Sequence, residues 1–192
     1  MTDTSHVLPQ ALHDLGAALW FGGAVMGVAG VNKSGADLRD GLDKVRVASS
    51  AWQRFAPVEW AGIATVLVTG AQLSRASKGR LAAQHGWARA GSTKAGVAVA
   101  GAAATAYAAY TGNKISKVAE RLEKSGKPVD VKDATVPNAG TPAELASWQK
   151  KQRAAQQLVP LLSGANIVLN SYLVQTYRPG ATVKGLVRSL VR

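Results

Sequence analysis

Residues 8–31 read LPQALHDLGAALWFGGAVMGVAGV, and this stretch decides the fold. It is apolar and rich in small residues over about the length that an α-helix needs to cross the hydrocarbon core of a bilayer. Three later stretches share this character, at residues 57–74, 88–110 and 158–177. The sequence therefore predicts an all-α fold, a bundle of four transmembrane helices forming one domain over residues 1–192.

Composition agrees with this division into apolar and polar segments. The mean hydropathy of +0.01 is low for a membrane protein, but nearly all the charge lies between the apolar stretches. The absence of cysteine excludes disulfides, thiolate nucleophiles and thiolate metal sites. The net charge of +12 is spread over every loop, with no basic patch interleaved with aromatic residues, so we expect anionic lipid headgroups rather than nucleic acid as the partner.

Amphipathic patterns extend the helices beyond the membrane on the side of the first and third loops. One pattern leads into the second span, with Pro57 as a possible kink, and another follows the third span. Residues 126–141, GKPVDVKDATVPNAGT, mix proline, glycine and charge without periodicity, which predicts a flexible loop. Helix is expected to resume near Pro142.

Orientation in the membrane is open to two interpretations. Lys and Arg are more numerous in residues 32–56 and 112–157 than in the second loop and after Tyr177, which favours both termini outside. Residues 181–192, ATVKGLVRSLVR, form a basic amphipathic tail suited to an anionic leaflet, which favours the reverse. From the distribution of basic residues we expect both termini outside.

Small residues mark a predicted helix-packing face on the first span. Gly16, Gly23 and Gly30 recur every seven residues, and Gly27 follows Gly23 by four. Such a stripe lets another helix backbone approach closely, which is how helices associate in lipid. In the fourth span Asn166 and Asn170 share a face with Ser163, and we expect their amides to bind neighbouring helices.

Ionisable residues inside or beside the spans are the candidate site. His13 and Asp14 near the start of the first span lie on the same side of the membrane as His85 and Lys94 at the start of the third. They are either hydrated interfacial groups or the wall of a polar ligand-binding pocket, in which His13 could take up a proton. Glu59 is a further buried-charge candidate, with Arg54 one turn earlier as a possible partner.

Catalytic and cofactor motifs are not recognisable in the sequence. We expect no enzyme activity, no bound metal and no cofactor. A haem held by two histidines between spans is poorly supported, because only His13 lies in or near a span.

The opening LHDLGAALWFGGAVMGVAGVN, residues 12–32, resembles the first span of uncharacterised four-helix integral membrane proteins of actinobacteria. It is more remotely similar to the copper-resistance D-type membrane families, whose first helix reads as His, several apolar residues, Trp and then Gly-Gly. Residues 77–96, SKGRLAAQHGWARAGSTKAG, also resemble the actinobacterial group. The resemblance implies a four-helix fold in a bacterial plasma membrane. A copper path is not expected here, because the chain has three histidines, two methionines and no cysteine.

The predicted function is that of a non-enzymatic membrane protein, an accessory or scaffold subunit or a homo-oligomer that acts through helix packing. The alternative is a carrier or sensor of a small ligand or metal, with its pocket near His13, Asp14 and Lys94. A basic soluble four-helix bundle is a third possibility, which stable partitioning into membranes would exclude.

Overall fold

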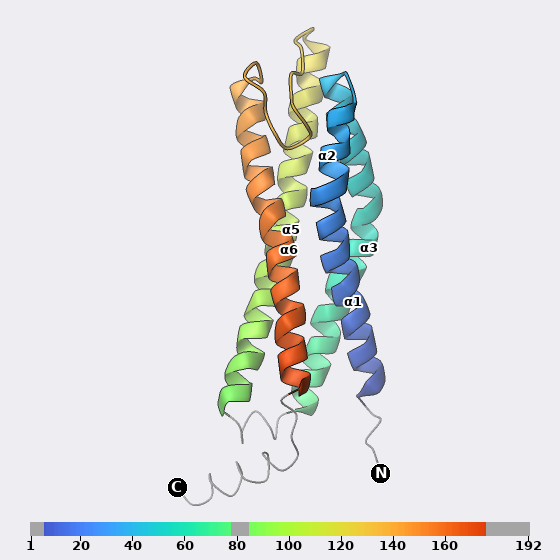
Figure 1. Ribbon diagram of the computed structural model, residues 1–192, viewed down its shortest axis with the longest axis vertical. Helices are drawn as coiled ribbons and strands as arrows, with labels where there is room; N and C mark the ends of the chain where they lie inside the picture. The colour runs from blue at the N-terminus through green and yellow to red at the C-terminus, as the bar shows by residue number, and fades with distance from the viewer. Residues whose placement is uncertain (1–5, 78–84, 176–192) are drawn as a thin grey trace, which may run out of the picture.

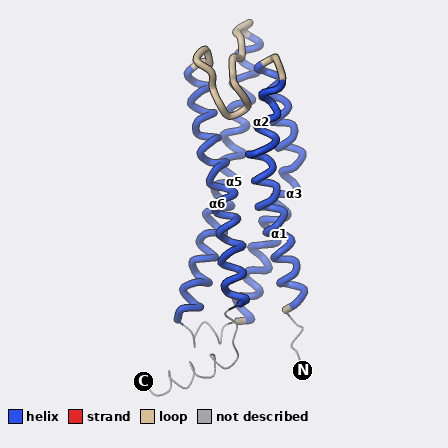
Figure 2. Tube along the Cα trace, in the orientation of Figure 1, coloured by secondary structure: helices blue, strands red, loops and turns tan. Residues whose placement is uncertain are grey.

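The computed structural model describes residues 6–77 and 85–175, and within them the chain is helical (Figures 1 and 2). No strand forms in this part of the chain, where an isolated antiparallel bridge joins Val131 to Pro137. The all-α prediction is confirmed. The tail at residues 181–192 lies outside the described residues.

The first helix changes its winding on the way through the bundle. Helix α1 spans Val7–Met26 and continues as a π-helical turn, η1, over Gly27–Val31. Helix α2, Asn32–Ser34, and a 3-10 turn, η2, Gly35–Asp37, complete it. Because a π-turn accommodates one more residue than an α-turn, the buried side passes from Gly27 to Asn32, five residues on. The π-turn thereby directs the Asn32 amide into the bundle.

Three long helices follow. Helix α3, Gly41–Ala76, begins at Asp40, whose carboxylate accepts hydrogen bonds from the backbone N–H groups of Leu42 and Asp43. It runs through Pro57 as one helix. Helix α5 spans His85–Lys124 and helix α6 spans Ala143–Gln175, with Pro160 inside it. The predicted extensions beyond the second and third spans are therefore continuous with the spans themselves.

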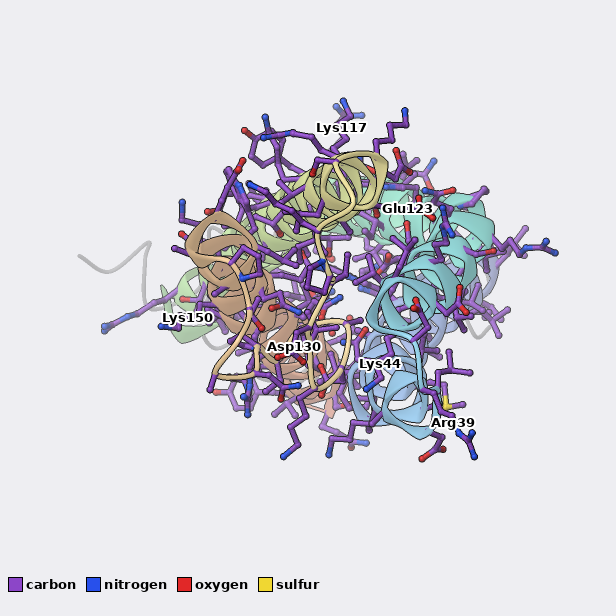
Figure 3. All side chains as sticks on the ribbon, turned by 90° about the horizontal axis from the view of Figure 1, so that it is seen from above. Arg39, Lys44, Lys117, Glu123, Asp130 and Lys150 are labelled. Atoms are coloured by element: carbon purple, nitrogen blue, oxygen red, sulfur yellow. The ribbon has the colours of Figure 1, made fainter. Side chains whose placement is uncertain are left out.

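These helices form an up-and-down bundle. Helix α1 packs along α3, α5 packs along α6, and contacts of α3 with α5 and of α1 with α6 close the ring. Helix α1 begins and α6 ends at the same end of the bundle (Figure 1). Charged side chains that include Arg39, Lys117, Glu123 and Lys150 lie around the opposite end (Figure 3).

Length and composition make two of the described helices long and apolar enough to cross a membrane. They are Val7–Asp37 and Ala143–Gln175, each of which contains a sufficiently apolar stretch. The prediction of four long helices is thus confirmed, whereas hydropathy marks only these two as membrane-like.

The bundle exposes many large apolar side chains and buries many polar ones alongside its apolar core. Large apolar side chains are exposed along its outside, among them Leu8 at 67%, Leu161 at 67% and Val168 at 68%. Polar side chains fill much of the interior between the helices: His13, Asn32, Glu59, Thr69, Thr105, Thr111, Gln149, Gln152, Gln156, Ser163, Asn166 and Asn170. In a soluble fold, polar side chains of this size are mostly exposed.

The glycines of the first helix face α3 of the same chain. A Cβ at Gly16 would lie 2.7 Å from the carbonyl oxygen of Gly62, and one at Gly62 would lie 2.9 Å from that of Gly16. Gly23 is covered by the ring of Phe55 and Gly27 by that of Trp52. At Gly30 the nearest neighbour is the side chain of Met26, one turn earlier on the same helical stretch. Gly16, Gly23 and Gly27 therefore serve packing within the monomer.

The loop at residues 126–141 folds back onto the bundle instead of projecting freely (Figure 1). Val131 is 2% exposed and packs in an apolar cluster with Leu145. The buried Gln149 side chain donates hydrogen bonds to the backbone carbonyls of Asp133 and Ala134. Anchored in this way, the loop closes one end of the helix ring, in contrast to the flexible loop expected from its composition.

Candidate functional site

All four long helices contribute to one hydrogen-bonded cluster near the end where α1 begins. It consists of His13 and Asp14 from α1, Thr69 from α3, Lys94 from α5 and Asn170 from α6, and we call it the His13 cluster. The Lys94 Nζ lies 2.8 Å from His13 Nε2 and 2.7 Å from Asn170 Oδ1. The His13 Nδ1 lies 3.0 Å from Thr69 Oγ1.

The hydrogen-bond directions assign the tautomer of His13. Thr69 has one hydroxyl hydrogen, which it donates to the backbone carbonyl of Thr65. Its oxygen therefore accepts from His13, so Nδ1 carries the imidazole proton. The Nε2 atom is then free to accept from the ammonium group of Lys94. A doubly protonated imidazole would instead turn an N–H toward that ammonium.

A second branch leads from Lys94 to the surface. Lys94 donates to the Asn170 carbonyl oxygen, and the Asn170 amide donates to Asp14 Oδ1 at 2.8 Å. Gln10 donates to the same carboxylate oxygen at 2.9 Å. Asn170 thus joins a cation on one side to a carboxylate on the other, across three helices.

The members of the His13 cluster become more exposed from His13 toward Asp14. His13 is 1% exposed and Thr69 5%, whereas Lys94 is half-buried and Asp14 is exposed. The Asp14 carboxylate is therefore the part of the cluster that solvent or a solute reaches first.

The structure brings the predicted site residues His13, Asp14 and Lys94 together. Asn170 mediates between Asp14 and Lys94 in place of the expected direct pair. Asn170 was expected only to join helices and is also a member of the candidate site. His85 is the first residue of α5, and its side chain lies outside the described part of the structure.

Sequence reasoning missed Thr69. No sequence signal distinguishes it from the other threonines of the apolar stretches, because its role depends on facing His13 across the helix contact.

A polar stripe on α6 connects the His13 cluster to the rest of the interior. Its buried members are spaced alternately by three and four residues: Gln149, Gln152, Gln156, Val159, Ser163, Asn166 and Asn170. Only the part inside the fourth span was predicted as a face. The same spacing in Gln149, Gln152 and Gln156 is the sequence signal that could have extended it.

The described residues contain no group of three or more His, Cys, Asp or Glu side chains that could hold a metal ion. The one lone pair of His13 that a metal could use already accepts from Lys94.

Comparison with known proteins adds no assignment: no family model, curated protein or solved structure matches the chain.

Proposed function

We propose that the protein is a four-span integral membrane protein of a bacterial plasma membrane that binds a small polar solute at the His13 cluster, as a carrier or sensor. The main observation behind this proposal is the position of Lys94, whose ammonium group lies inside the helix bundle and is hydrogen-bonded to His13 and Asn170. Ionisable groups within membrane spans are costly and mark solute or ion sites more often than ordinary packing.

The exposed apolar side chains on all four helices, together with the buried polar ones, support four spans. Exposed large apolar side chains occur on α1 and α6 and also on the two helices that hydropathy does not mark. On α3 they include Val58 and Val68, and on α5 they include Val99 and Tyr107. Lipid would cover these side chains. The polar side chains of the interior would hydrogen-bond to one another, because hydrocarbon offers them no other partners.

The chemistry of the His13 cluster indicates the class of solute. An ammonium group has three N–H donors, and His13 and Asn170 take two of those of Lys94. A solute with a carbonyl, carboxylate or phosphate oxygen would accept the third. Asp14, exposed beside it, would bind a donor on the same solute.

The test is recovery of a solute with the purified protein. The chain is expected in the membrane fraction after carbonate washing, and mass spectrometry of the detergent-purified protein should detect a small polar molecule. Lys94→Met should abolish its recovery. Lys117→Met, which changes an exposed lysine of the same helix, should leave it unchanged. Equal recovery from both variants would refute a role for Lys94, and extraction by carbonate would refute membrane insertion.

A second candidate, an accessory or scaffold subunit or a homo-oligomer, is favoured by the outer face of α5. Ser92, Gly96, Ala100 and Ala103 are exposed and small, so another helix could approach closely there. A Cβ at Gly96 would meet no atom within 4 Å, so Gly96→Leu should leave the monomer folded. If this face binds a partner, cross-linking in native membranes should lose a band in Gly96→Leu and keep it in Lys94→Met.

A further inference from the structure

A cavity of about 190 Å³ lies between the four helices, at a different level from the His13 cluster. Its wall includes Asn32 from α2, Trp52 and Glu59 from α3, Thr105 from α5 and Gln156 from α6. No member of the His13 cluster lines it. Between the two sites lies an apolar layer built around Trp20 and Ile63.

Glu59 is the charged side chain of this cavity. It is only 5% exposed, and its carboxylate makes no hydrogen bond or ion pair with the described residues. Arg54, the partner suggested by the sequence, is exposed and does not reach it. The lining contains no lysine or arginine. A buried carboxylate ordinarily has a cation or several donors beside it.

Three N–H donors in or beside the wall are committed elsewhere. The Trp52 indole N–H donates to Asn32 Oδ1 at 2.9 Å, and the Asn32 amide donates to Gln156 Oε1 at 2.6 Å. The Trp20 indole N–H donates to Thr105 at 3.2 Å. These bonds hold the wall in place and leave the Glu59 carboxylate as an acceptor directed at the space.

We infer that this cavity binds a small organic ammonium ion, with Glu59 as its counter-ion. The space is several times the roughly 30 Å³ of a water molecule, so it suits a molecule of several atoms rather than a single ion. One carboxylate among amides and hydroxyls is too few charges for a divalent metal. The indole rings of Trp52 and Trp60 in the wall are surfaces that attract an organic cation.

Calorimetric titration of the full chain in detergent tests this with three molecules of similar size: n-propylammonium, neutral 1-propanol and anionic propionate. The first should bind and the other two should not. Glu59→Gln keeps the side-chain shape and should weaken n-propylammonium binding by about tenfold or more. Glu120→Gln, an exposed glutamate on α5, is the matched control and should bind as the wild type does.

A second variant keeps the test informative if Glu59→Gln does not fold. Ala108→Leu fills the cavity from α5 without touching the carboxylate and should also abolish binding. Absence of n-propylammonium binding to the wild type, equal binding by Glu59→Gln, or equal binding of 1-propanol would each overturn the inference. None of these outcomes bears on Lys94, so the proposed function stands or falls separately.

Discussion

His13 shows how a neighbouring side chain decides the chemistry of a titratable group. A neutral histidine side chain can carry its proton on either ring nitrogen, and a charged one carries a proton on both. Thr69 fixes that choice, because its own hydrogen is given to Thr65 and only its oxygen remains for His13. The Lys94 contact then requires a lone pair on the other nitrogen. Neither constraint can be found without knowing which helix faces α1.

Thr69→Val tests this arrangement. The substitution keeps the side-chain shape but removes the hydroxyl acceptor of the His13 Nδ1–H, so the free energy of unfolding should fall by about 1 kcal/mol. Thr93→Val, at an exposed position on α5, is the control and should change it little. Unfolding titrations in mixed micelles measure both. An unchanged stability in Thr69→Val would mean that Thr69 does not accept the imidazole proton.

Gly16 gives a second test, concerning backbone contact. Gly16→Ala would force a methyl group against the Gly62 carbonyl, which belongs to a helix and cannot rotate away, so a loss of about 1–3 kcal/mol is expected. At Gly22, where a Cβ meets nothing within 4 Å, the same substitution should be neutral or stabilising. Thermal unfolding in detergent separates the two. Equal effects would argue against close packing of α1 on α3.

Among the helices, α6 presents the least usual buried face, because most of its interior positions are polar. Asn170 satisfies its amide with Lys94 and Asp14, whereas both polar atoms of the fully buried Asn166 side chain lack a partner. Two asparagines one turn apart on one face therefore have opposite energetic roles.

Leucine at each position should reveal the difference. Asn166→Leu removes an unsatisfied amide and should raise the free energy of unfolding by about 1–3 kcal/mol, while Asn170→Leu breaks two bonds to charged groups and should lower it. Unfolding titrations of the two variants side by side are the measurement. A similar loss of stability in both would show that the Asn166 amide has a binding partner.

The proposed membrane environment would account for the bundle as a whole. Its exposed ion pairs, such as Arg46 with Glu123 at 2.8 Å, contribute little to stability. An apolar outside and a hydrogen-bonded inside are favourable together when hydrocarbon surrounds the middle of the helices. In the proposed four-span arrangement, the charged side chains of Figure 3 and the anchored loop would lie at the end outside the membrane.

Topology can be measured directly, because the chain contains no cysteine and any introduced one is unique. With both termini outside, Ser74→Cys at the far end of α3 should react with a membrane-impermeant maleimide in intact cells. Lys132→Cys in the anchored loop should react only after the cells are opened. The reversed pattern would place the termini inside, and labelling of both positions in intact cells would contradict four spans.

The sequence by itself determined the four helices, since helical patterns and the breaks between them are local properties of the chain. It also determined that His13, Asp14 and Lys94 would lie at one end, because consecutive helices of an up-and-down bundle run in opposite directions. Tertiary structure decided the rest. Which atoms meet depends on how each helix is rotated about its axis, and contacts such as Gly16 with Gly62 and the π-turn before Asn32 set that rotation. Only with it fixed do Thr69 and Asn170 join the His13 cluster, and only then does Glu59 face a cavity without a counter-ion.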